Sequence, residues 1–258
     1  MGSGGQMSRI IDSPFAVFAI ALIVQWGAAY VGDHLRRKSQ HLRQDEQADF
    51  DTVLTASLTL LALIIGFSFS MAVSRYDQRK NSEEAEANAI GTAYLRADLL
   101  PADDAAKVRE LLRTYVNQRI SFYLGDAHRM SEPSPDPAKL QAELWSSVAR
   151  AATAQPTPVI ALAVSGMSDV MSAQGYTRAA WLNRIPIAAW SLMGLIAIFS
   201  NLLLGYRERS KGTLALLVLP IIASIAFFLI ADIDSPQGGV INVVPHNLIA
   251  TSQSMKTG

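Results

Sequence analysis

The chain has 258 residues, of which 50% are hydrophobic, and its 22 basic and 22 acidic side chains cancel to a formal net charge of zero. This balance gives no reason to expect nucleic acid as a partner, and the lack of cysteine excludes disulfides, thiolate metal sites and a cysteine nucleophile. The mean hydropathy of +0.21 does not by itself fix the class of protein, so the distribution of apolar residues must do so.

Four windows along the chain are long, apolar and nearly free of charge. Each reaches about the 20 residues that a helix needs to cross a bilayer. A soluble protein can bury one such helix, but four in one chain indicate a membrane protein. The windows are Pro14–Val31, Thr52–Ser74, Ile185–Tyr206 and Thr213–Ala231.

These windows predict an all-α membrane protein with four transmembrane helices in two hairpins and a helical extramembrane domain between spans two and three. The leading MGSGGQ is typical of residues added for expression, and the first window lacks the basic start and cleavage site of a signal peptide, so we expect it to span. The expected parts are 1–6 (added residues), 7–74 (first hairpin), 75–184 (extramembrane domain), 185–231 (second hairpin) and 232–258 (a non-helical tail).

The second window opens the longest predicted helix, from Thr52 to Leu100, which contains no proline. Its first half is apolar, and its second half is too charged to dissolve in lipid. At 1.5 Å per residue the helix would be about 70 Å long, roughly twice the hydrocarbon thickness of a bilayer. We therefore expect a membrane span that continues as a stalk.

The middle region is predicted to be helical as well. Apolar residues recur at three- and four-residue steps over Val108–Tyr123 and Leu140–Val148, and a shorter helix follows over Val159–Ala173. Residues 125–137, GDAHRMSEPSPDP, carry three prolines and predict a loop. No stretch shows the alternation of a strand.

One face of the second span is small and weakly polar, which has two interpretations. A pore or water-lined surface needs such a face, but small residues also let helices approach closely in lipid. Periodicity alone leaves both open. The residues of this face are Thr52, Thr55, Thr59, Ala62, Gly66 and Ser70.

The stalk has an acidic face and an apolar face. Asp77, Glu84 and Asn88 could line a vestibule or a cation site, or could belong to a solvated face with Arg79–Glu83 and Lys80–Glu84 as helix ion pairs. The apolar face predicts packing against the middle helices and consists of Ala87, Ile90, Tyr94 and Leu95.

Two carboxylates, Asp232 and Asp234, stand where the fourth span ends, and charges at a membrane edge must be hydrated or paired. They could pair with Arg75 or Arg79, remain hydrated, or bind a divalent cation, which usually needs more oxygen ligands than two carboxylates supply. The four histidines have no metal spacing, and no catalytic or phosphate-binding motif occurs, so we expect neither an enzyme nor a cofactor or metal. Asn201 inside the third span predicts a helix–helix hydrogen bond.

The segment IGFSFSMAVSRY resembles the second-span motif of the bestrophins, an LGFYVTLVVTRW-type sequence. The match is without gaps, and Tyr76 replaces a tryptophan. The layout of two spans, a large helical middle and two more spans is similar too. AEANAIGTAYLRADLLP and ADIDSP resemble a bacterial membrane family known only as bestrophin-like, and that resemblance covers nearly all of Met7–Asn247.

Bestrophins are pentameric anion channels, so the resemblance implies a homo-oligomer in the lipid bilayer that passes inorganic anions. It also implies a narrow neck at Thr59, Leu63 and Phe67, on one helix face with Gly66 and Ser70. Hydrophobic rings can gate by dewetting, and the edges of phenylalanine rings can favour an anion. Thr59 and Leu63 replace bulkier groups, and the acidic calcium clasp of animal bestrophins has no clear match, which puts calcium gating in doubt.

The location expected from the same resemblance is the inner cell membrane, with the termini and the extramembrane domain in the cytoplasm. Basic residues near the spans number seven on each side, so the positive-inside rule does not decide the orientation. The rival hypothesis is a membrane sensor or scaffold that conducts no ions and signals through its helical domain.

Overall fold

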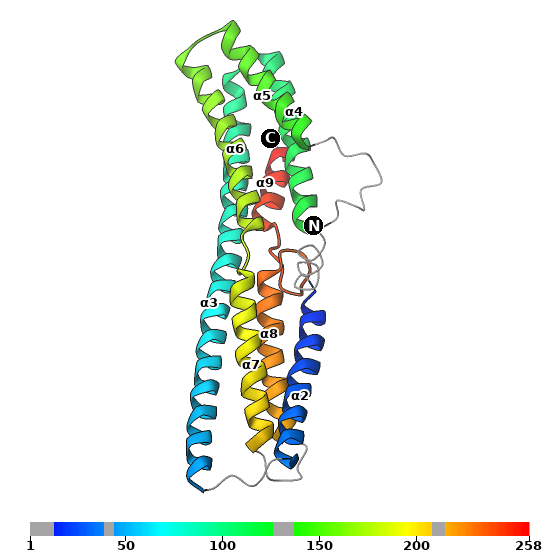
Figure 1. Cartoon of the computed structure of the whole chain (residues 1–258). Helices are drawn as coiled ribbons and strands as arrows, with labels where there is room; N and C mark the ends of the chain where they lie inside the picture. Colours follow the sequence, from blue (N-terminus) through cyan, green and yellow to red (C-terminus); the bar gives the residue numbers. More distant parts are fainter. Residues whose placement is uncertain (1–12, 39–43, 126–136, 208–214, 258) are drawn as a thin grey trace. The chain divides into compact units, whose positions relative to one another are not determined.

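The computed structural model describes residues 13–38, 44–125, 137–207 and 215–257 (Figure 1). Over these ranges the chain is mostly helical and has no strand. It divides into two compact units, unit 1 with Met1–Tyr76 and Arg184–Asn242, and unit 2 with Asp77–Asn183 and Val243–Gly258. The helices are α2 (Pro14–Lys38), α3 (Gln44–Arg96), the short 3-10 helix η1 (Ala97–Leu99), α4 (Ala102–Leu124), α5 (Pro137–Ala154), α6 (Pro158–Leu182), α7 (Ile187–Arg207), α8 (Ala215–Asp234) and α9 (His246–Thr257).

The helix α3 runs without a break through residues of both units. It begins before the predicted Thr52, and η1 completes its last turn. Leu100 then takes an extended conformation with φ −87° and ψ 161°. The ring of Pro101 disfavours helical backbone in the preceding residue, which explains why the helix stops here.

Four stretches of the described helices are long and apolar enough to cross a membrane, and each overlaps one of the predicted windows. The prediction of an all-α, multi-pass membrane protein is therefore confirmed. The stretches are Pro14–Lys38, Ala48–Leu99, Pro158–Arg207 and Leu217–Asp234.

Within unit 1, α2 packs against α7 and α8 (Figure 1). A Cβ atom on Gly32 would lie 2.1 Å from the carbonyl oxygen of Leu202, and a Cβ atom on Gly205 would lie 1.9 Å from that of Ala29. The two backbones therefore touch at positions where only glycine fits, as is common between helices in lipid. The pairing of the spans into two hairpins stays a prediction.

A buried chain of hydrogen bonds joins three of the membrane helices. The side-chain amide of Asn201 donates to Gln25 Oε1 at 3.0 Å, and Gln25 Nε2 donates to Ser224 Oγ at 3.4 Å. All three residues are buried. The helix–helix hydrogen bond predicted for Asn201 is confirmed, with α2 as its partner helix.

In unit 2, α4 packs against α5 and α9, and α5 packs against α6. The apolar pattern that predicted these helices faces inward at Val108, Leu112 and Leu144, which are 1% exposed or less. Gly125 ends α4 with φ +70°, and most of the loop predicted at 125–137 lies outside the described residues. The third helix, α6, starts after the N-cap Thr157 and runs well past the predicted end at Ala173.

The prediction of a non-helical tail at 232–258 is wrong. α8 continues to Asp234, and α9 occupies His246–Thr257. The prolines and glycines between them correctly indicate an irregular link, but the tail then resumes a helical pattern. Leu248, Ser252 and Met255 recur at steps of four and three and are buried in unit 2.

The apolar face of the stalk is mostly as predicted. Ala87, Ile90 and Tyr94 are buried, but Leu95 is 71% exposed. Neighbouring residues point about 100° apart on a helix. Leu95 therefore points away from the packed face that Ile90 and Tyr94 share.

Candidate functional site

The membrane part of α3 has one packed face. Leu54, Leu61, Ser68 and Ala72 are buried, at steps of seven, seven and four residues, so they form a stripe along the helix. Leu61 and Ala72 join the hydrophobic core of unit 1 with residues of α2, α7 and α8, such as Met193. This stripe fixes which side of α3 is left uncovered.

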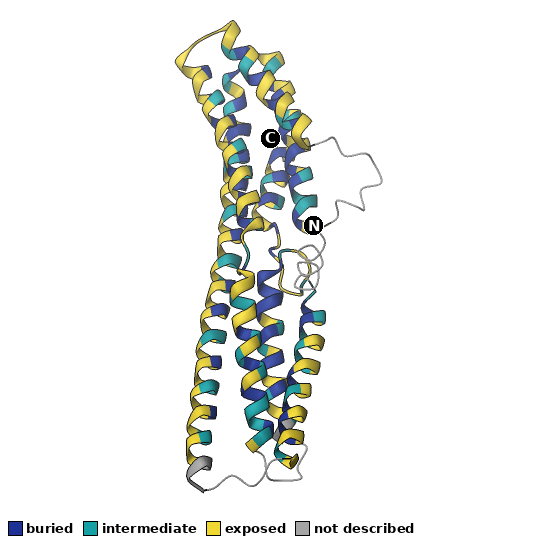
Figure 2. Cartoon of the chain, in the orientation of Figure 1, coloured by how far each residue is buried: buried dark blue, intermediate teal, exposed yellow. Residues whose placement is uncertain are grey.

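The five residues predicted to line a pore all lie on the uncovered side. Leu63 is 51% exposed and Phe67 is 62% exposed, and Thr59, Gly66 and Ser70 are exposed as well. Figure 2 shows exposed residues along this helix. We name these five residues the open face of α3.

Gly66 of the open face does not pack against any other described part of the chain. A Cβ atom on Gly66 would meet no atom of the described residues within 4 Å. Thr59 and Leu63 help to line a shallow hollow whose residues, from Asp51 to Leu63, are all on α3. Among the residues that the structure describes, none covers this face, so close packing here would need another molecule.

The Thr59 hydroxyl of the open face is satisfied within the helix, as is that of Thr52 two turns earlier. Thr59 Oγ1 donates to the carbonyl oxygen of Thr55 at 2.9 Å, and Thr52 Oγ1 donates to that of Ala48 at 3.0 Å. A hydroxyl bonded in this way can still accept a hydrogen bond from water, and it can also pack against apolar neighbours. The face is thus weakly polar without a fixed charge between Thr52 and Ser74.

The charged candidates that follow on α3 divide into buried and exposed ones. Arg79 is 1% exposed, and Arg75 is partly buried, whereas Asp77 and Glu84 are exposed. Asp77 and Glu84 are therefore the exposed candidates, which agrees with either the vestibule or the solvated-face interpretation of the acidic side.

The two carboxylates at the end of α8 accept hydrogen bonds from backbone amides and are not exposed to solvent. Asp232 is 1% exposed and accepts hydrogen bonds from the amides of Val240 at 2.6 Å and Ile241 at 3.0 Å. A Cβ atom on Gly239 would lie 2.3 Å from the Asp232 carboxylate, so the loop can close around it only with glycine there.

Asp234, also 1% exposed, accepts from the amide of Ile185 at 3.2 Å. The sequence suggested ion pairing, hydration or a cation for these two residues, and amide binding was missed because its partners lie in loops. In the described part of the chain no group of three or more histidine, aspartate or glutamate side chains is placed to hold a metal ion.

In the sequence, Glu83 and Glu86 form an acidic cluster with Glu84, which predicted a vestibule or cation site or part of a solvated helix face, but the structure buries both Glu83 and Glu86. Glu83 is 1% exposed and accepts from Asn247 Nδ2 at 2.7 Å and from the Leu248 amide at 2.9 Å, at the start of α9. A carboxylate is favoured there by the positive end of the helix dipole. The only sequence signal for the burial of Glu83 is its spacing, which puts it on the same helix side as Arg79 and Ile90.

Glu86 is the second buried acid and joins three helices of unit 2. Arg119 of α4 donates to it through Nε at 2.5 Å and Nη2 at 3.2 Å, and Thr177 of α6 donates its hydroxyl at 3.0 Å. The Arg119 guanidinium also lies 4.4 Å from the centre of the Phe122 ring. Both Glu86 and Arg119 are buried, so the ion pair is sheltered from water.

The comparisons with known proteins assign the chain to a family. The family model of the Bestrophin-like domain matches residues 15–248, and the chain belongs to this family. No curated protein matches the chain.

Solved structures of a bacterial bestrophin homologue from Klebsiella pneumoniae have the same fold. One, phased with zinc, has 16% sequence identity and a TM-score of 0.61, and the match covers 93% of this chain and 94% of the homologue. Two variants of the homologue have 15% and 14% identity and TM-scores of 0.63 and 0.66, and they match over 92% and 95% of this chain and 96% of their own. At these identities the likeness shows the fold.

Proposed function

We propose that the chain is one subunit of an oligomeric ion channel in the cell membrane and that the open face of α3 lines its pore. The observation that carries the proposal is the exposure of this face in a helix that crosses the membrane. Membership of the bestrophin-like family supports it, since bestrophins are channels.

A single subunit cannot enclose a pore with one helix face. Copies arranged around an axis would bring their α3 helices together, each with its packed stripe turned outward to α7 and its open face turned inward. The resemblance to bestrophins favours five copies. Such an assembly covers the side chains of Leu63 and Phe67 that one chain leaves exposed.

The residues of the open face suggest a hydrophobic constriction. Leu63 and Phe67 are four residues apart, so their copies would form two stacked rings, and such rings can close a pore by dewetting. Thr59, one turn away, would form a wider and more polar ring. Ring edges of Phe67 carry partial positive charge, which supports the anion preference implied by the family resemblance.

The proposed location is the inner membrane of a bacterium, with the extramembrane domain in the cytoplasm. This placement follows the bestrophin analogy. A scaffold or sensor that conducts no ions is the alternative, since the buried polar contacts of unit 2 would also suit a signalling domain.

Recordings from purified protein in planar lipid bilayers test the proposal. We expect currents that follow a chloride gradient, and we expect Leu63→Ala and Phe67→Ala to change them because each removes one ring. Leu192→Ala is the control, because Leu192 is 49% exposed on α7 and lies outside the open face. A silent bilayer under every gradient, or currents that neither ring variant alters, would favour the scaffold.

A further inference from the structure

The first membrane helix ends in a buried carboxylate that holds two arginines. Asp33 of α2 is 8% exposed, and a charge so close to the end of a span is costly unless it is paired. Arg36 Nη2 donates to Asp33 Oδ1 at 2.8 Å, and Arg37 Nε donates to Asp33 Oδ2 at 2.8 Å. One carboxylate thereby fixes two guanidinium groups at the membrane edge.

These arginines retain hydrogen-bonding capacity beyond this carboxylate. Each guanidinium has five N–H donors, more than its share of one carboxylate can accept. The Nε of Arg36 is buried and has no hydrogen-bond partner among the described residues. The side chain of Arg37 is 70% exposed. With Lys38 beside them, the last turn of α2 has three positive charges against one negative charge, so an anion with several acceptor oxygens would complete the cluster.

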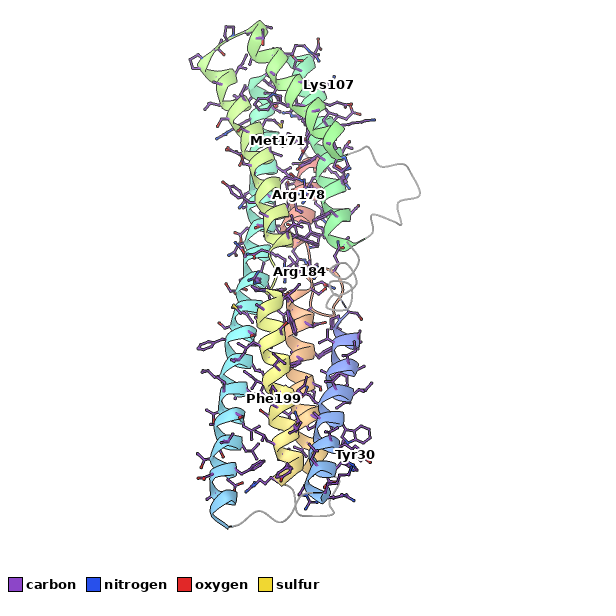
Figure 3. All side chains as sticks on the ribbon, in the orientation of Figure 1. Tyr30, Lys107, Met171, Arg178, Arg184 and Phe199 are labelled. Carbon is purple, nitrogen blue, oxygen red and sulfur yellow. The ribbon has the colours of Figure 1, made fainter. Side chains whose placement is uncertain are left out.

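Two aromatic residues place this cluster at the level of lipid headgroups. Trp26 is 49% exposed and Tyr30 is 67% exposed, and they share one face of α2 with Arg37 because the steps are four and seven residues. Figure 3 shows Tyr30 pointing away from α7 and α8. Tryptophan and tyrosine collect where the hydrocarbon meets the headgroups, with basic residues just beyond.

We propose that Arg36 and Arg37, held by Asp33, bind the phosphate of an anionic phospholipid whose acyl chains lie along Trp26 and Tyr30. Charge complementarity and the aromatic stripe favour a lipid over a soluble anion, because a free phosphate would gain nothing from the aromatic side chains. Planar, forked arginine groups suit a phosphate better than the point charge of lysine does. The site does not depend on the proposed channel function.

The test is a titration of the full-length protein, kept in phosphatidylcholine, with phosphatidylglycerol, followed by native mass spectrometry and by thermal unfolding. We expect the wild-type protein to retain phosphatidylglycerol and to unfold at a higher temperature with it. Replacing both arginines, R36Q with R37Q, should lower the apparent affinity roughly thirty-fold, about five-fold for each basic side chain near an anionic surface.

Two further variants distinguish a loss of lipid binding from misfolding of the protein. D33N combined with R36Q and R37Q leaves no unpaired buried charge and should also lose the lipid, while Tyr30→Ala leaves the ion pairs intact and should weaken retention several-fold. K107Q with R150Q is the control, because it removes two exposed positive charges from α4 and α5. Equal retention by the triple variant and the wild type, an equal loss in the control, or equal stabilisation by phosphatidylcholine and phosphatidylglycerol would overturn the proposal.

Discussion

Glu86 has no exposed surface, and its carboxylate receives hydrogen bonds from Arg119 and Thr177, which belong to two other helices. The exposed Glu84, two residues away, points outward on the same helix. Side chains so close in sequence thus have opposite environments, and their energetic roles should differ accordingly.

Replacing Glu86 by glutamine should destabilise the protein strongly. The change leaves the buried Arg119 guanidinium without its counter-charge, and breaking a buried pair on one side costs about 3–5 kcal/mol. Glu84→Gln is the matched control and should cost less than about 0.5 kcal/mol, as surface changes usually do. Denaturant unfolding of the two variants in detergent gives both values, and equal losses would refute the structural role of the pair.

Tyr115 should make the protein sensitive to alkali. Burial, and then the charge of Glu86, raises the pKa of Tyr115 from 10.0 to about 12. Above about pH 10 the unfolded chain releases this proton while the folded chain still holds it, so stability falls as the pH rises towards about 12. The loss from this residue would reach about 2–3 kcal/mol.

The variant Tyr115→Phe cannot ionise and should show a shallower fall of the unfolding temperature over the same range. Tyr123, whose pKa burial also raises, would account for part of the remaining slope. An unchanged pH profile in Tyr115→Phe would mean that this phenol does not contribute.

At the level of helices, the contact between α2 and α7 depends on two glycines. Gly205→Ala should lower the free energy of unfolding by about 1–3 kcal/mol or more, since its Cβ would overlap the Ala29 carbonyl. Gly194→Ala on the same helix is the control, because a Cβ atom there meets no atom of the described residues within 4 Å. Thermal unfolding compares the two, and equal effects would show that the helices do not touch as described.

Composition and periodicity were enough to predict most helices. The spans follow from long apolar windows, and α4 and α5 follow from their three- and four-residue steps. The helix α9 was missed because Pro236, Gly238 and Gly239 indicated a loop and its apolar residues are few. A short helix of this kind depends on what it packs against, which a sequence does not display.

The same limit explains why some parts of the candidate site could be predicted from the sequence and others could not. The open face of α3 could be predicted because all its residues are on one helix, where spacing gives direction. The partners of Glu83 and Glu86 lie 33 to 165 residues away in the chain, so no local pattern could place them. Asp232 and Asp234 were singled out as costly charges, but their amide partners were not predictable for the same reason.

For the whole molecule, the central claim is that the open faces of several α3 helices surround a water-filled path. The packed stripe through Leu61 and Ala72 is already covered within one chain, whereas the stripe through Leu63 and Phe67 is not. The proposed channel would place the second stripe on the axis, whereas a scaffold would not require it there.

Cysteine accessibility during bilayer recording tests this claim most directly, because the chain has no cysteine of its own. Single variants Thr59→Cys, Leu63→Cys and Phe67→Cys are treated with a charged, membrane-impermeant thiol reagent, with Leu61→Cys as the control. We expect the current to be blocked in variants of the open face and to be unaffected in Leu61→Cys. Block in none of the three, or equal block in Leu61→Cys, would contradict a pore lined by α3.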